Sequence, residues 1–115
     1  MRRGQIRAVA LTAQSGSGAG PTCQAVIISN DAANAAAAHT DRGVVTVVPV
    51  TTNTGRVHPF QVFLPAGLTG LPHDAKAQAE QVRSVTAGHV GERLGELPPA
   101  LLTQLDQALR VHLDL

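Results

Sequence analysis

The sequence has few of the residues that form disulfides or zinc sites, or that cross membranes. Its 115 residues include one cysteine, Cys23, which excludes an internal disulfide and leaves no cysteine-based zinc site. No apolar stretch approaches the roughly 18 residues of a membrane helix, and none near the N-terminus resembles a signal peptide. The net charge of +1 excludes a strongly basic tail for gripping duplex nucleic acid. We expect one soluble, cytoplasmic domain over residues 1–115, without metal or cofactor.

The residues that are present predict short strands separated by turns. Apolar and β-branched runs indicate strands at 6–11, 25–29, 44–50 and 61–64, and a further strand over 76–85. A Ser/Gly-rich stretch at 12–20 reads as a loop, and Asn30-Asp31 as a turn or helix cap. The sequence therefore predicts a mainly β chain.

Two helices complete the predicted elements. An alanine-rich segment predicts a short helix at 32–39, and Pro98-Pro99 can open a last helix. In that helix apolar residues recur at helical spacing, at Leu101, Leu105 and Leu109 among others. Together these features predict an α+β fold, a small antiparallel barrel with a C-terminal helix.

Short motifs in a fixed order carry a family resemblance along nearly the whole chain. They are Arg3-Gly4, ISND at 28–31, VVPVTTN at 47–53, PFQVFLP at 59–65, GLPHDA at 70–75, EQVRSV at 80–85 and LDQALRVHLDL at 105–115. Each motif is weak alone, but their order and spacing are specific. The chain resembles the MazF/PemK family of toxin endoribonucleases, the mRNA interferases.

This resemblance implies a fold and a function. The fold would be an SH3-like barrel, similar to that of CcdB toxins, in a homodimer. The activity would be metal-independent cleavage of single-stranded RNA at a short sequence motif, by the toxin of a type II toxin-antitoxin system. The partners would be the RNA and a MazE-like antitoxin whose tail occupies the RNA groove.

The resemblance also implies site residues, with one departure. Thr51 matches the catalytic threonine, but Cys23 stands where the family has an arginine, and the loop glutamate of the family is absent. Because an arginine would stabilise the charge on the phosphorane, its loss raises the alternative of a catalytically impaired module that still binds RNA or antitoxin. Arg7, which replaces a family aromatic, offers a different source of the cation. The expected RNA contacts are Ser17, Gly18, Thr52, Asn53, Arg56, His58, Glu80, Gln81 and Arg83.

Each of these residues has a simpler structural interpretation. Thr51 could only bond a turn amide, Cys23 could be a small buried residue, and His58 could end a strand rather than move protons. Arg56 and Arg83 could be solvated, and Glu80 could face water. With Phe60 and Phe63 as the only aromatics, base stacking is hard to provide, so hydrogen bonds must carry RNA recognition.

Overall fold

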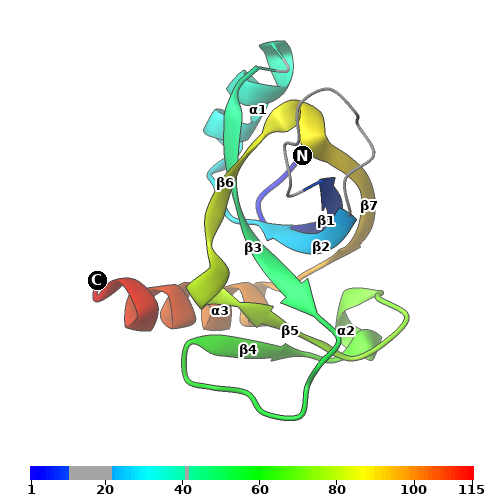
Figure 1. The fold of residues 1–115 in the computed structure, drawn as a ribbon, viewed down its shortest axis with the longest axis vertical. Helices are drawn as coiled ribbons and strands as arrows, with labels where there is room; N and C mark the ends of the chain where they lie inside the picture. The colour runs from blue at the N-terminus through cyan, green and yellow to red at the C-terminus, as the bar shows by residue number, and fades with distance from the viewer. Residues whose placement is uncertain (11–21, 41) are drawn as a thin grey trace.

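A computed structural model describes residues 1–10, 22–40 and 42–115, and the predicted loop at 12–20, with Ser17 and Gly18, lies outside them. Figure 1 shows a curved sheet with one helix at either end of the long strand β3. The elements are β1 (Gln5–Ala10), β2 (Thr22–Ile27), α1 (Asp31–Thr40), β3 (Val44–Thr51), β4 (Gln61–Leu64), α2 (Ala66–Thr69), β5 (Ala75–Gln78), η1 (Ala79–Gln81), β6 (Arg83–Thr86), η2 (Ala87–His89), β7 (Val90–Glu96) and α3 (Pro99–Leu113).

The sheet is organised around β3. Its strand order is β4-β5-β3-β2-β1-β7, every pair is antiparallel, and β6 also pairs with β3. One edge of β3 thus faces β2, while the other faces β6 along its first half and β5 at its end. Pro49 falls between the residues of β3 that pair with β6 and those that pair with β5, so a missing N–H there removes no bond to either strand.

The α+β class and the C-terminal helix are confirmed, and over the described residues the antiparallel sheet is curved without closing into a full barrel. Among the described residues no ladder joins β7 to β4 or to β6, so the sheet curls without closing. Strands β5 and β6 pair with different parts of the same edge of β3. Strands β4 and β7 are therefore the two ends of the main strand order and are not joined to each other.

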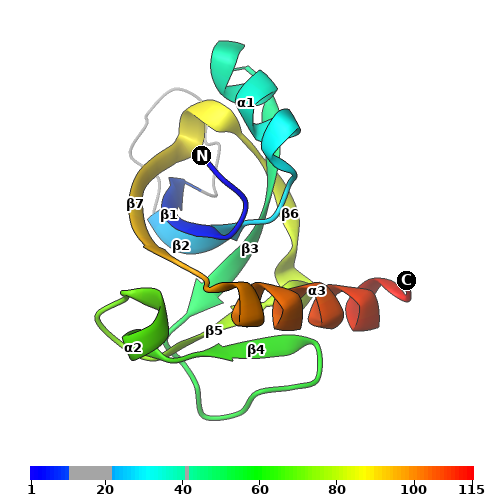
Figure 2. The ribbon, with the colours of Figure 1, turned by 180° about the vertical axis from the view of Figure 1, so that it is seen from behind.

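The core has two parts, one on each face of the sheet. Val48 and Val50 face a cluster that includes Leu101 and Leu105 of α3, whereas Val45 and Val47 face a cluster that includes Ala37 of α1. Figure 2 shows α3 crossing the sheet near β4 and β5, with α1 at the far end of β3. Burial on both faces explains why 44–50 is a continuous apolar run rather than an alternating one.

The helix predictions hold in detail. Asn30 caps α1, because its Oδ1 accepts a bond from the backbone N–H of Ala33 at 2.8 Å. Helix α3 begins as predicted, with Pro98 at the N-cap and Pro99 at the first helical position. Among the residues described, no helix combines the length and apolar character needed to span a bilayer.

The strand prediction over 76–85 is wrong, because a 3-10 turn, η1, divides it into β5 and β6. The two strands pair with different parts of β3, and η1 provides the offset between them. Strand β7 was not predicted, since its sequence is polar and contains two glycines. Both are needed for close approach: a Cβ on Gly95 would lie 2.5 Å from the carbonyl oxygen of Thr69, and one on Gly91 3.1 Å from that of Ala8.

Candidate nucleic-acid interface

Thr51 ends β3 at a place where three strands meet. It pairs with Lys76 of β5, while Gln24 of β2 pairs with Val50. Continuing the β2–β3 register by one residue brings Cys23 opposite Thr51. Paired residues point to the same face of a sheet. The side chains of Thr51, Lys76 and Cys23 therefore share one face.

The loop after Thr51, residues 52–60, is shaped by its own side chains. The Oγ1 atom of Thr51 accepts a bond from the N–H of Asn53 at 3.2 Å, and the Oδ1 atom of Asn53 accepts one from the N–H of Gly55 at 3.4 Å. Thr51 thus bonds a turn amide, as its simpler interpretation required. A hydroxyl that accepts one bond still has its own proton to donate, so the catalytic interpretation remains open.

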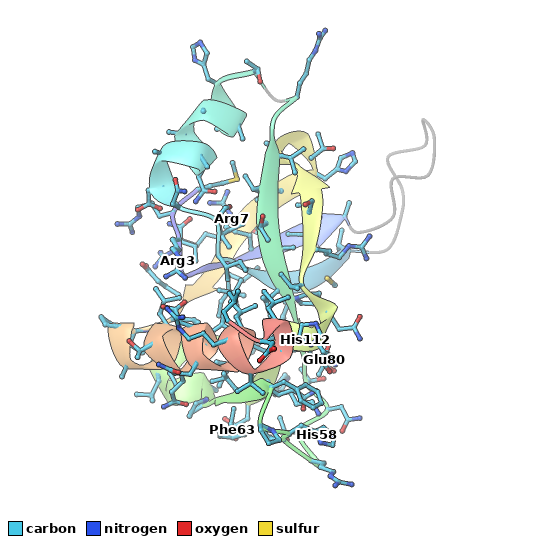
Figure 3. All side chains as sticks on the ribbon, turned by 90° about the vertical axis from the view of Figure 1, so that its left-hand side faces the viewer. Arg3, Arg7, His58, Phe63, Glu80 and His112 are labelled. Atoms are coloured by element: carbon cyan, nitrogen blue, oxygen red, sulfur yellow. The ribbon has the colours of Figure 1, made fainter. Side chains whose placement is uncertain are left out.

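The far end of this loop has an aromatic pair. The rings of His58 and Phe60 stack with centroids 5.1 Å apart and planes 1° from parallel. Phe63 follows on β4 and is 40% exposed. Figure 3 shows His58 and Phe63 below α3, whereas Arg7 lies above it.

Arg83 lies on the same face as Thr51 and acts on Cys23. It pairs with Val47, which is four residues before Thr51 on β3 and so points to the same side. Burial raises the pKa of the Cys23 thiol, and the positive charge of Arg83 opposes this rise. The Cys23 thiol is therefore within electrostatic range of a guanidinium.

Arg7 is directed toward the β7 edge of its strand, on the face that the β1–β2 register shares with Cys23. Its Nε atom donates to the carbonyl oxygen of Gly91 on β7 at 2.8 Å, and its Nη1 atom to Oε1 of Gln5 at 3.0 Å. Since β7 and β2 lie on opposite edges of β1, these bonds hold the guanidinium on the edge away from Cys23.

The remaining predicted contacts divide into exposed and inward-facing side chains. Thr52, Asn53, Arg56 and Gln81 are exposed, as a binding surface requires. Glu80 is turned inward, because its Oε2 atom accepts a bond from Nε2 of Gln61 at 2.6 Å and its Oε1 atom is buried. In the described ranges, no three His, Cys, Asp or Glu side chains gather as a metal site would require.

Two residues of this region were not predicted, Lys76 and Gln61. Each is only 8% exposed, although both are polar. Lys76 is the only lysine in the chain and lies between two alanines of β5, and all three of these residues are buried. The signal that could have identified Gln61 is its position directly after the loop, at the first residue of β4.

Comparison with known proteins gives a consistent picture. Residues 2–113 match the model of the PemK-like, MazF-like toxin of type II toxin-antitoxin systems. Over 115 residues the chain is 52% identical to "Endoribonuclease MazF9" of Mycobacterium tuberculosis, covering 100% of this chain and 98% of that protein. It is also 33% identical over 91 residues to "Endoribonuclease MazF2" of Mycobacterium bovis, covering 78% of this chain and 76% of that protein.

Solved structures share the fold. A mycobacterial endoribonuclease in complex with its cognate antitoxin superimposes with a TM-score of 0.77 at 26% identity, covering 100% of this chain and 96% of that one. MazF from Deinococcus radiodurans gives a TM-score of 0.76 at 25% identity, with 100% and 97% covered. The family match, the full-length relative and the shared fold agree, and the chain belongs to the PemK-like, MazF-like family of toxins of type II toxin-antitoxin systems.

Proposed function

We propose that this chain is the endoribonuclease toxin of a toxin-antitoxin pair, a cytoplasmic homodimer that cuts single-stranded RNA until a MazE-like antitoxin covers the cutting surface. The full-length similarity to a protein named as an endoribonuclease carries this proposal. That relative also disfavours the alternative of a catalytically impaired binding module. The polar and cationic side chains at the end of β3 are its structural support.

The chemistry of metal-independent RNA cleavage has three requirements. The 2′-hydroxyl loses a proton to a base and its oxygen attacks the adjacent phosphorus, the P–O5′ bond breaks, and the leaving 5′-oxygen takes up a proton. The products are a 2′,3′-cyclic phosphate and a 5′-hydroxyl. Negative charge accumulates on the phosphorane oxygens in between, so the site needs donors and a cation placed there in advance.

In our proposal Thr51 and Arg83 stabilise the negative charge on the phosphorane oxygens. The Thr51 hydroxyl, already bonded by the N–H of Asn53, donates its proton to a phosphate oxygen. The guanidinium of Arg83 supplies the positive charge that the family arginine would otherwise bring, from a neighbouring strand instead of from position 23. Cys23 is then a small neutral neighbour and takes no part in proton transfer.

The loop of residues 52–60 supplies RNA recognition in this proposal. Asn53 and Gln81 offer amide donors and acceptors for base edges, and Arg56 offers a cation for the backbone. The stacked pair of His58 and Phe60 offers a ring face to one base, which compensates in part for the shortage of aromatics.

The test is cleavage of a long RNA in the presence of EDTA. Wild-type protein should cut it and leave cyclic phosphate ends, and Thr51→Ala should reduce the rate by roughly two powers of ten. Thr103→Ala, at an exposed position on α3, is the matched control and should cut normally. Wild-type protein that binds RNA in EDTA but leaves it intact would favour the impaired module.

A further inference from the structure

Two polar ties hold the loop of residues 52–60 to the sheet. The Nζ atom of Lys76 donates to the carbonyl oxygen of Arg56 at 2.5 Å, in the middle of the loop. At the end of the loop, Oε1 of Gln61 accepts a bond from the N–H of His58 at 3.1 Å, and Nε2 of Gln61 donates to Glu80 at 2.6 Å. With the bond between Thr51 and Asn53, the loop is restrained at its start, middle and end.

Burying the polar side chains that make these bonds costs free energy, which a role in placing the loop would explain. Lys76 and Gln61 are each 8% exposed, so both side chains have given up most of their contact with water. The Oε1 atom of Glu80 is buried and has no hydrogen-bond partner among the described residues. Apolar side chains of similar size would fill this space without desolvating charged or polar groups.

The direction of Glu80 separates it from its exposed neighbour. Gln81 is exposed in the same 3-10 turn, whereas Glu80 points toward Gln61 and the interior. Figure 3 shows Glu80 beside α3, above the labelled His58 of the loop. A carboxylate held in this way reaches the loop through Gln61, and its charge is not presented to a bound strand.

We propose that Lys76 and Glu80 are positioning residues that set the loop of residues 52–60 for binding RNA, and that neither contacts a base. This proposal rests on the proposed function, because it assumes that the loop meets the substrate. An ordered loop presents Asn53, Arg56 and His58 without paying the entropy of ordering at each binding event. Releasing the loop should weaken substrate binding and leave the chemistry at Thr51 largely intact.

Three variants test the ties. Lys76→Met keeps the length of the side chain and removes the ammonium, Glu80→Leu removes the acceptor of Gln61, and Glu80→Gln restores an acceptor oxygen without the charge. We expect Lys76→Met and Glu80→Leu to raise KM about tenfold with kcat within about threefold of wild type, as loss of loop order predicts. Glu80→Gln should have a KM close to that of wild type. Glu92→Gln, at an exposed position on β7, is the control.

Hydrogen exchange of the loop amides is the readout that does not depend on activity. Exchange at residues 52–60, above all at the N–H of His58, should be faster in Lys76→Met and Glu80→Leu than in wild type. If wild-type protein cut no RNA, the proposed function would fail, and exchange would still decide whether the ties hold the loop. Unchanged exchange in both variants would overturn the positioning role.

Two kinetic outcomes would also overturn it. An equal rise in KM for Glu80→Gln and Glu80→Leu, with exchange of the loop amides as in wild type, would mean that Glu80 acts on RNA directly. A fall in kcat for Lys76→Met at unchanged KM would place Lys76 in the chemistry. Should Glu80→Leu fail to fold, Gln61→Met removes the side chain that links His58 to Glu80. Its effect on hydrogen exchange should match that expected for Glu80→Leu.

Discussion

The Nε atom of Arg7 donates to the backbone carbonyl of Gly91 at 2.8 Å, which fixes this guanidinium on the edge of β1 that faces β7. The other arginine considered for the phosphate, Arg83, extends from β6 on the face that also has Thr51, and its charge acts on the thiol of Cys23. The two arginines therefore have different relations to the proposed cutting site.

We expect Arg83→Ala to lower kcat/KM for RNA cleavage by roughly two powers of ten, because the phosphorane would lose the positive charge that we assign to Arg83. Arg7→Ala should have a much smaller effect, and Arg93→Ala, an exposed arginine on β7, is the control for loss of one positive charge. Single-turnover rates in EDTA would measure these effects. A larger loss in Arg7→Ala than in Arg83→Ala would assign the phosphate to Arg7 instead.

The Cys23 thiol should react slowly at neutral pH. Burial raises its pKa above the ordinary value, so little thiolate forms near pH 7. Alkylation by iodoacetamide, followed by mass spectrometry, should be slower than for a free thiol and should accelerate only at a higher pH than it does for a free thiol. Arg83→Ala should slow it further, because the charge that favours the thiolate would be gone. Rapid alkylation at pH 7 would contradict this prediction.

The same shift has a consequence for stability with a defined sign. The folded state binds the thiol proton of Cys23 more tightly than the unfolded state. The neutral thiol therefore contributes to the free energy of unfolding at pH values below its pKa in the unfolded state, and this contribution is lost as pH rises through its pKa in the folded state. Wild type should therefore lose more unfolding free energy than Cys23→Ala between neutral and alkaline pH. The chain has no tyrosine, so no phenol titrates in this range. Urea unfolding of both proteins at several pH values would measure the difference.

The exposed apolar end of α3 should form part of the contact between two copies of the chain. Val111, Leu113 and Leu115 are 58%, 49% and 77% exposed, beside a groove of about 380 Å³ that Leu113 and Leu115 help to line. We expect a homodimer in sedimentation, and Val111→Glu combined with Leu113→Glu should shift it to monomer by placing charges in the interface. Leu68→Glu on α2, at a position 59% exposed, is the control and should remain dimeric. A wild-type monomer at all concentrations would refute this.

Packing between α1 and β3 should depend on the absence of a side chain at Gly43. A Cβ there would lie 2.3 Å from Cα of Ala37, so the helix backbone would have to move. Gly43→Ala should lower the unfolding free energy by about 1–3 kcal/mol. Gly67→Ala, where no atom lies within 4 Å of the added methyl group, should change it by less than about 1 kcal/mol. Urea denaturation would compare the two, and equal losses would show that the clash is relieved without strain.

Local sequence patterns predicted most of the elements. The apolar run at 44–50 became β3 because it is buried on both faces, and the leucine spacing after Pro98-Pro99 became α3 because one side of that helix packs on the sheet. The motif order also predicted the family, since it spans nearly the whole chain. These properties depend on residues close together in sequence.

Other properties depend on which strands meet. The break at η1 arises because β5 and β6 pair with different parts of β3. The helical propensity of residues 75–80 disfavours a continuous strand, but it does not locate the division. Strand β7 forms from a polar, glycine-containing segment because it pairs with β1, and its two glycines allow close approach to the backbone of Ala8 and Thr69. Sequence periodicity cannot report a neighbour that is distant along the chain.

The environment of the site was decided in the same way. The sequence alone determined that Thr51 lies at the end of an apolar β-branched run, and its resemblance to the family predicted that Cys23 stands where the family has an arginine. Only the tertiary structure decided that Arg83 acts on Cys23, that Arg7 bonds to β7, and that the single lysine is buried beneath the loop it holds. Charges and hydrogen bonds act over a few ångströms in space, and here the partners are between 20 and 84 residues apart in the chain.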